Sequence, residues 1–471
     1  MSYHSAIFAL FFTAVVSLSY LVSRARRVPL LLAASTLFYL SFAAQNIFVL
    51  AGLIIFTYCA GLLIERSKSP RIRKLWLIAG VVTNLGLMAT FKYSLDVLGK
   101  SFGVVPVGLS FHAFQAIAYT VEVYRGRQAA ERSFPVFALY VMFFPQIAAG
   151  PIERPQDILP QFHNPGPFRY DSVVAGLQLM LWGMLQKYVV ADRLGVVVNG
   201  IYDNPAGLSG PVTAIGAVCF SFQIFCDFAG YSNIALGAAQ VLGLRLTRNF
   251  NAPFHADSMA EYWKRWHITL SSWMRDYVFF PLCGKRPRML RICACIMIVF
   301  LANALWHGLR LNYLVSGLLH GVYRVTELLA SRAISRRGWT LNPFWSEPAR
   351  FARILLVFSL MTFAFIFFRG QDLAQSLRVA TRLFSGWAAV LNPAAIVAEL
   401  RNTGVPFINV LEAPLLIFVI EAIEYLRSGG PLRPRIAALP VWYRWSIYYA
   451  VAAVVLLFAV PQAESFIYFA F

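Results

Sequence analysis

Apolar runs long enough to cross a lipid bilayer recur along most of the chain. The first two, Ala6–Val22 and Val28–Ala44, are separated only by a short segment that carries Arg24, Arg26 and Arg27. A transmembrane helix needs roughly 20 mostly apolar residues, with a lower limit of about 17. Backbone polar groups find no partners in hydrocarbon, so a chain built from such runs is expected to cross as helices.

Further runs extend this pattern to the end of the chain. They lie at Asn46–Leu63, Leu75–Phe91, Val104–Tyr124, Phe134–Gly150, Val173–Ala191, Pro211–Phe228, Met289–Trp306, Leu311–Ala330, Phe351–Phe368, Ile408–Tyr425 and Trp445–Val460. Segment Phe384–Val397 fits either a span or an interfacial helix. The sequence thus predicts an all-α polytopic bundle of about 11–13 transmembrane helices, together with short interfacial or re-entrant helices. No internal repeat or linker is detectable, so residues 1–471 are predicted to form one domain.

The composition agrees with a membrane protein. Hydrophobic residues make up 59% of the chain and charged residues 13%, whereas soluble domains carry about 25% charged residues. The formal charge of +20 comes from basic residues in short segments between apolar runs, such as Arg24–Arg27, Glu65–Lys74 and Arg125–Arg132. Basic loops of this kind face the cytoplasm beside anionic lipid, so the N-terminus is predicted outside. Nucleic acid is not an expected partner.

Two segments break the alternation of spans and loops. Pro151–Pro167 is polar and rich in proline, which indicates a loop or re-entrant turn packed against protein. Residues 244–291 contain no run long enough to cross, and are predicted to be a cytoplasmic interfacial or re-entrant segment. Within it Ser258–Leu282 reads as one or two short amphipathic helices, with Asp257 or Ser258 as N-cap. Three tryptophans are expected on its interfacial surface: Trp263, Trp266 and Trp273.

Histidines and charged residues are concentrated among apolar segments between Asp227 and His320. A bilayer tolerates such groups where they face a protein interior or a wet cavity, and there they usually serve function. Histidine suits a general base because its unperturbed pKa of about 6.5 lies near working pH. The six cysteines form no C-x-x-C pair and read as buried thiols, and no metal site is expected.

Ordered motifs cover most of the chain. They are Pro106–Gln115, Val123–Gly126, Phe143–Ile152, Leu185–Asp192, Asp227–Ser232, Asn249–Phe254, Tyr262–Ser271, Arg275–Tyr277, Trp306–Gly308 and Phe367–Arg369. In this order they resemble the membrane-bound O-acyltransferase family, and within it the bacterial branch that O-acetylates exported polysaccharides such as alginate. The resemblance implies a helical bundle that encloses a tunnel joining the two faces of the membrane.

The resemblance also implies roles for the histidines. His307, in the Trp-His-Gly motif with Trp306, corresponds to the family's catalytic base. His267 corresponds to a second polar position that orients the acyl group or acts at the other mouth of the tunnel, although an interfacial aromatic role is the plainer alternative. Trp306 and His320 are expected to support the tunnel, and a hydrogen-bonded structural histidine explains His320 equally well.

Charged residues are expected to support the tunnel and to meet the donor. Asp227 and Arg275–Asp276 are predicted to form an intramembrane charge pair, because a buried charge without a partner is strongly destabilising. Four basic residues are candidates to bind the phosphates of a coenzyme: Lys264, Arg265, Lys285 and Arg286. A solvated, lipid-facing basic surface explains these four equally well.

The function implied is transfer of an acyl group, expected to be acetyl, from a cytoplasmic thioester across a bacterial inner membrane. The acceptor would be a hydroxyl of an exported polysaccharide or of a periplasmic acyltransferase partner, and the N-terminus would be periplasmic. No cofactor is expected to be tightly bound, because acetyl-CoA or an acyl carrier acts as donor substrate. D-alanyl transfer from a carrier protein to a cell-wall polymer is the alternative within the class. A polar-solute transporter or channel is the alternative outside it.

Overall fold

The computed structural model describes residues 5–98, 108–147, 150–203, 207–338, 346–428, 430 and 432–459. Every regular element in these ranges is helical, which confirms the all-α prediction. Three predicted runs extend outside these ranges: the first four residues of Val104–Tyr124, residues 148 and 149 of Phe134–Gly150, and the last residue of Trp445–Val460. The described residues form two compact units: unit 1 has those up to Met184 together with Tyr231–Arg248, and unit 2 has Leu185–Gly230 and those from Asn249 onward.

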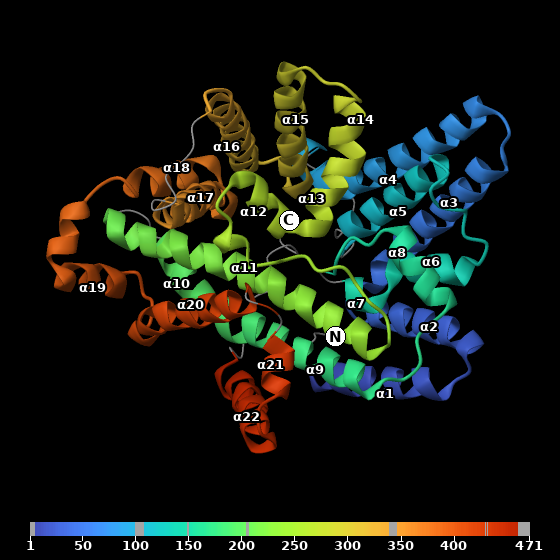
Figure 1. Cartoon of the computed structure of the whole chain (residues 1–471), viewed down its shortest axis with the longest axis horizontal. Coiled ribbons are helices and arrows are strands. Elements are labelled where there is room, and N and C mark those ends of the chain that lie inside the picture. The colour runs from blue at the N-terminus through green and yellow to red at the C-terminus, as the bar shows by residue number, and fades with distance from the viewer. Residues whose placement is uncertain are drawn as a thin grey trace. The chain divides into compact units, whose positions relative to one another are not determined.

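Unit 1 consists of helices from the first half of the chain and the end of one long helix. The helices are α1 (Ala6–Leu21), α2 (Arg24–Ala43), α3 (Ile47–Arg66), α4 (Pro70–Leu98), α5 (Leu109–Tyr124), α6 (Phe134–Met142), α7 (Phe144–Ile147), α8 (Pro155–His163), α9 (Tyr170–Met184) and the last turns of α11 (Gly210–Val241), with a 3₁₀ turn at Ala44–Asn46. Helices α3, α4 and α5 pack side by side (Figure 1). Helices α1, α2 and α3 begin and end within four residues of the predicted apolar runs.

A buried carboxylate ties the proline-rich segment of unit 1 to the chain that follows α11. Glu153 is 1% exposed, and its Oε2 accepts a hydrogen bond of 3.0 Å from the hydroxyl of Thr247. The hydroxyl of Tyr140 donates to the backbone carbonyl of Glu153 at 3.1 Å. Burial raises the pKa of Glu153 to about 7, against the opposing effect of the donors from Thr247. Segment Pro151–Pro167 is thus packed against protein, as predicted, and part of it forms α8.

Unit 2 holds the rest of the chain. Its elements are a π-helical turn η2 (Leu185–Ala191), α10 (Asp192–Asp203), the first part of α11, α12 (Met259–Arg265), α13 (Ile268–Met274), the π-helical η4 (Arg275–Phe279), α14 (Phe280–Cys283), α15 (Met289–His307), α16 (Leu311–Arg336), α17 (Ser346–Arg369), α18 (Leu373–Arg382), α19 (Pro393–Asn402), α20 (Phe407–Ser428), α21 (Leu432–Ala437) and α22 (Val441–Phe458), with 3₁₀ turns η3 (Pro253–His255) and η6 (Trp387–Leu391).

Helices α15 and α16 pack closely as neighbours in unit 2 (Figure 1). A Cβ atom at Gly317 would lie 2.6 Å from the Cβ of Ala304 and 2.7 Å from the carbonyl oxygen of Phe300. Real Cβ atoms do not approach other atoms so closely, so glycine at this position lets the two helix backbones meet.

The described residues contain seven helical stretches long and apolar enough to cross a membrane, or eight if the bent pair α19–α20 counts as one. These seven or eight stretches are fewer than the predicted transmembrane helices, of which about 11–13 were expected. The stretch Arg24–Arg66 joins two predicted spans in 43 residues, and α1 and the stretch Phe134–Ile147 are shorter than a full span. The number of crossings therefore depends on how short and joined helices are counted.

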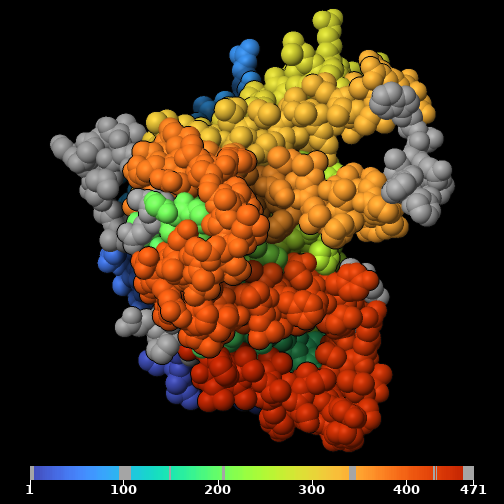
Figure 2. All heavy atoms as spheres, turned by 90° about the vertical axis from the view of Figure 1, so that its left-hand side faces the viewer, coloured from blue at the N-terminus to red at the C-terminus, as the bar shows by residue number. Residues whose placement is uncertain are grey.

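One face of unit 2 carries α18, α19 and α20, in orange and red in Figure 2. Segment Phe384–Val397 lies there and contains η6 and the first turn of α19, so it does not cross as a single helix. The chain bends by 111° between α19 and α20. Phe384, Trp387 and Leu391 are exposed on this part of the chain.

A buried ionic cluster joins η2, α10 and α11 inside unit 2. The Nζ of Lys187 lies 2.7 Å from Oδ1 of Asp192 and 2.6 Å from Oδ1 of Asp227, and all three residues are at most 3% exposed. The partner predicted for Asp227 was wrong, because Arg275 forms its ion pair with the adjacent Asp276 in a more exposed position. A buried carboxylate needs a cation from an equally buried segment, and η2 supplies it.

We predict that Lys187→Met lowers the free energy of unfolding by roughly 3–5 kcal/mol, because it leaves two buried carboxylates without their shared cation. Thermal unfolding of the purified protein in detergent measures the change. Arg275→Met, which removes an exposed ion pair, is the matched control and is expected to change stability by less than about 1 kcal/mol. Equal unfolding temperatures for Lys187→Met and the wild type would contradict a stabilising cluster.

Candidate active site

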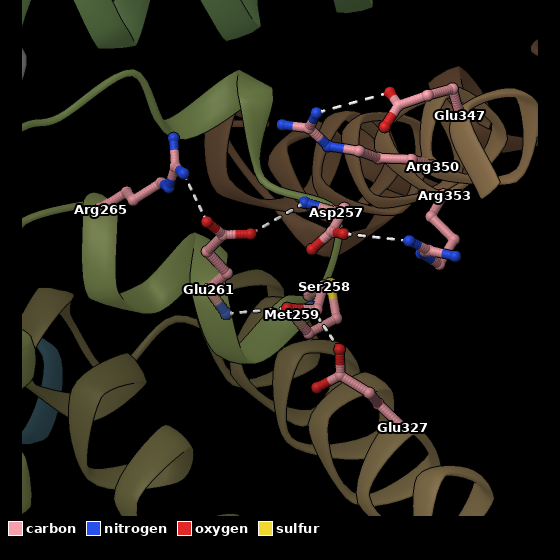
Figure 3. A network of polar contacts seen from close by, with 9 residues as sticks. All are labelled: Asp257, Ser258, Met259, Glu261, Arg265, Glu327, Glu347, Arg350 and Arg353. Carbon is pink, nitrogen blue, oxygen red and sulfur yellow. Dashed lines mark hydrogen bonds and ion pairs between the residues drawn. The ribbon is translucent and has the colours of Figure 1, made fainter. Parts of the chain in front are cut away.

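Helix α12 begins in a network of capping groups in unit 2 (Figure 3). Ser258 is the N-cap, as predicted, and its hydroxyl oxygen accepts a hydrogen bond of 3.2 Å from the N–H of Glu261. The carboxylate of Glu261 accepts from the N–H of Asp257, the residue before the N-cap, at 3.3 Å. Glu327 of α16 accepts from the N–H groups of the first two residues of α12, at 2.6 and 3.1 Å. The start of α12 is therefore held by its own residues and by α16.

Arginines around the same network hold α12 further (Figure 3). Arg353 of α17 pairs with Asp257 at 3.2 Å, and Arg265 pairs with Glu261 and donates to the carbonyl of Ala252 at 3.2 Å. Arg265, a candidate for phosphate binding, thus has a clear role in holding the segment. The other three candidates are exposed and lie outside the cavity described below: Lys264, Lys285 and Arg286. Their phosphate-binding role stays a prediction.

His267 sits between α12 and α13 in a left-handed backbone conformation, with φ of 41°. This region is uncommon for residues other than glycine, and costs of order 1–3 kcal/mol. Asn249 holds the chain on the C-terminal side of His267. Its carbonyl accepts from the N–H of Ile268 at 2.9 Å, and its Oδ1 accepts from the hydroxyl of Thr269 at 2.6 Å. These bonds keep the strained residue in place.

The imidazole of His267 is buried among aromatic rings. It is 1% exposed and packs edge-on against Phe228, with ring centroids 4.6 Å apart. Burial lowers the pKa of His267 to about 3, so this histidine, which lies outside the candidate spans, is neutral near pH 7. The interfacial alternative for His267 is therefore wrong. Trp266 and Trp273 are also buried, at 3% and 5% exposure, because the segment packs into unit 2 instead of lying on its surface.

His307 is the last residue of α15 and is also buried. Its ring lies perpendicular to Phe368 at 4.8 Å and packs on Trp306 at 4.7 Å. Gly308 ends the helix, and a Cβ atom there would lie 2.9 Å from the ring of Tyr313. The glycine in the Trp-His-Gly motif thus lets the ring of Tyr313 pack beside the turn that carries His307.

One small cavity in unit 2 brings the three sequence-predicted histidines together. Its volume is about 30 Å³, and His267, His307 and His320 line it, together with aromatic walls from Trp263, Phe365 and others. Trp306 lies outside the lining but packs on His267 at 6.1 Å between ring centroids. The charged candidates are not among the lining residues: Asp227, Arg275 and Asp276.

The sequence analysis missed two polar residues of the cavity wall, Asn303 and Ser316. The signal for Asn303 was present, because it lies four residues before His307 and so shares its face of the helix. Ser316 donates to the backbone carbonyl of Ala364 at 3.1 Å and is satisfied within the protein. In a site walled by aromatic rings, hydrogen bonds and charges act more strongly than in water. Imidazoles placed there can exchange a proton with a bound substrate.

Comparison with known proteins shows which family contains this chain. The profile of the membrane-bound O-acyltransferase family matches residues 102–371, a region that includes all three cavity histidines. The chain belongs to the membrane-bound O-acyltransferase family. It is 32% identical to the probable alginate O-acetylase of Pseudomonas aeruginosa over 82% of this chain and 75% of that protein. It is 30% identical to the peptidoglycan O-acetyltransferase of Helicobacter pylori over 74% of this chain and 72% of that protein.

A more distant relative is named for a different acyl group. The teichoic acid D-alanyltransferase of Bacillus subtilis is 26% identical over 56% of this chain and 69% of that protein. Membership of the membrane-bound O-acyltransferase family makes this chain a multi-pass membrane acyltransferase. The transporter or channel alternative has no support among these relatives.

We predict that Thr269→Val lowers the free energy of unfolding by about 1–2 kcal/mol and reduces acyltransferase activity. The substitution keeps the shape of the side chain but removes the hydroxyl that donates to Asn249, and so loosens His267. Thermal unfolding and acyl-transfer rate measure the two effects. Thr269→Ser retains the hydroxyl and is expected to behave nearly as the wild type. Wild-type behaviour of both variants would show that this bond does not hold His267.

Proposed function

We propose that the chain transfers an acetyl group from a cytoplasmic thioester to a hydroxyl of an exported polysaccharide or of a periplasmic acyltransferase partner. It would act in a bacterial inner membrane, with its N-terminus in the periplasm. The observation that carries the proposal is the meeting of His267 and His307 in one buried cavity inside the region that matches the family. The names of the relatives that act on alginate and peptidoglycan support an exported polysaccharide as acceptor.

In the proposed reaction His307 is the general base. Its neutral imidazole takes the proton of the acceptor hydroxyl while the hydroxyl oxygen attacks the thioester carbon. The tetrahedral intermediate then expels the thiolate, which receives the proton from the imidazolium, so ester and thiol are the products. His267, kept neutral by burial, orients the acyl group with its ring nitrogens.

The donor in this proposal is acetyl-CoA or an acyl carrier protein, and it acts as a substrate without being tightly bound. Both donors end in a phosphopantetheine arm that carries the thioester. The exposed cations Lys264, Lys285 and Arg286 lie on the segment predicted to face the cytoplasm, where they would attract the negative phosphates. Because no described residue of the cavity wall is a cation, the phosphates would stay outside the cavity and only the arm would enter.

D-alanyl transfer to a cell-wall polymer is the second candidate, favoured by the likeness to the Bacillus subtilis enzyme. It uses the same base and the same kind of thioester but delivers an acyl group that carries an ammonium. The aromatic walls of the cavity and the absence of a carboxylate among its lining residues favour acetyl. Incubation of membranes with labelled acetyl and labelled D-alanyl donors distinguishes the two by the label that the polymer gains.

We predict that His307→Ala abolishes acylation, with a loss of at least about 100-fold, because the hydroxyl loses its base. Labelled acetyl incorporation is measured in cells that lack any paralogue, together with membrane insertion and thermal unfolding of the variant. His163→Gln, which changes a histidine outside the cavity, is the control and is expected to retain activity. Normal acetylation by a folded His307→Ala variant would refute the assignment.

We further predict that the purified wild type releases CoA from labelled acetyl-CoA when an acceptor polysaccharide is present. The release should match the acetyl gained by the acceptor, because each transfer frees one thiol. A transporter would instead move solute with no loss of thioester. Intact acetyl-CoA after incubation of the folded protein with every candidate acceptor would contradict the free coenzyme as donor and leave an acyl carrier protein in that role.

A further inference from the structure

Three polar atoms of the cavity wall have no hydrogen-bond partner among the residues that the structure describes. They are Nε1 of Trp263, Oδ1 of Asn303 and Nδ1 of His320, and each is buried. His320 as a whole is 5% exposed. Buried polar groups are paired in the great majority of cases, and each exception needs an explanation. A substrate that completes the pairing is one such explanation, because all three atoms belong to residues lining one cavity.

The three side chains come from three elements that pack together in unit 2. Trp263 of α12 lies edge-to-face with His320 of α16, with ring centroids 5.1 Å apart and an interplanar angle of 88°. Both rings contact Phe300 of α15, at 5.1 and 6.0 Å. Asn303 follows Phe300 by three residues on the same helix and so lies on the same side. The wall that carries the three atoms is therefore built from mutually packed rings.

The chemistry of these atoms restricts what they can bind. An indole N–H only donates a hydrogen bond, the amide Oδ1 of Asn303 only accepts, and Nδ1 of His320 does either according to its tautomer. A ligand that satisfies Trp263 and Asn303 together must offer both an acceptor and a donor. A phosphate or a thioester carbonyl offers acceptors alone, and an alkyl chain offers neither. A hydroxyl and a secondary amide each offer both a donor and an acceptor, and in a pantetheine thioester the amide is the group held at a fixed distance from the sulfur.

We propose that Trp263, Asn303 and His320 form a subsite for the secondary amide nearest the thioester in a pantetheine arm. The inference rests on the proposed function, in which His307 acts on that thioester. Two methylene groups separate the sulfur from the amide nitrogen, a distance of about 4 Å. Asn303 precedes His307 by about one helical turn, or roughly 6 Å along the axis. One arm can therefore place its amide at Asn303 and its thioester at His307.

Two small donors isolate the amide from the rest of the arm. S-acetyl-N-acetylcysteamine carries the thioester and this first amide, and S-butyl thioacetate has the thioester with an alkyl chain in place of the amide. The subsite predicts that the wild type strongly prefers the amide donor in kcat/KM, because the alkyl donor leaves the buried polar atoms unpaired. Thiol release by the full-length protein in lipid nanodiscs, with a polysaccharide acceptor, measures both donors.

Trp263→Phe and Asn303→Leu test the subsite one atom at a time. The first keeps an aromatic ring but removes the N–H, and the second keeps the approximate volume but removes the acceptor. Each variant is expected to reduce the preference for the amide donor about tenfold, through slower use of that donor, while the rate with S-butyl thioacetate changes little. Trp273→Phe makes the same change outside the cavity lining and is expected to keep the wild-type preference.

The outcomes separate the subsite from the proposed function. A preference that survives in both folded variants, or an equal loss of rate with both donors, would overturn the subsite while leaving acyl transfer in place. A wild type that cleaves neither donor nor acetyl-CoA would overturn the proposed function, and the subsite with it.

Acetyl-CoA as a third donor identifies which molecule presents the amide. If the free coenzyme delivers it, both variants should lose activity with acetyl-CoA as they do with the cysteamine donor. If the wild type and variants respond to the cysteamine donor as predicted but the wild type does not use acetyl-CoA, the subsite is supported and its amide belongs to an arm held by a carrier protein.

Discussion

A lipid bilayer offers no hydrogen-bond partners, and this constraint accounts for where the polar groups of unit 2 lie. Lys187, Asp192 and Asp227 pair with one another inside the helices that carry them, so their charges are compensated within the protein. The cavity wall differs, since Trp263, Asn303 and His320 each hold a buried polar atom that no described residue pairs. In the ionic cluster the polar groups stabilise the protein, whereas at the cavity wall they are available to a substrate.

The segment between α11 and α15 fixes the position of His267 at the cavity. Helix α12 in this segment is capped by Ser258 and by Glu327 of α16. After α12 the chain passes through the left-handed conformation of His267. Asn249 holds the residues after His267 through backbone and side-chain hydrogen bonds. Local strain of this kind persists where the surroundings fix it, and such positions cluster at functional sites. The segment therefore brings one imidazole to the cavity that His307 of α15 reaches from another direction.

Hydropathy predicted the helices well but their contacts poorly. The run Ala6–Val22 became α1 with almost the same ends, because the length of an apolar run is a local property of the chain. The partner of Asp227 and the burial of Trp266 depend on contacts between distant segments, so the sequence placed both wrongly. Family resemblance singled out the cavity histidines, whereas Asn303 was overlooked although its position relative to His307 places both on one helix face.

The central claim is that a thioester reaches the cavity between the two imidazoles. A structure of the protein in lipid nanodiscs, determined with a non-cleavable thioether analogue of acetyl-CoA, tests it most directly. We expect the thioether sulfur and the adjoining acyl carbon to lie in the cavity lined by His267 and His307. An analogue bound with its acyl end at another place, separated from both imidazoles by protein, would contradict the account.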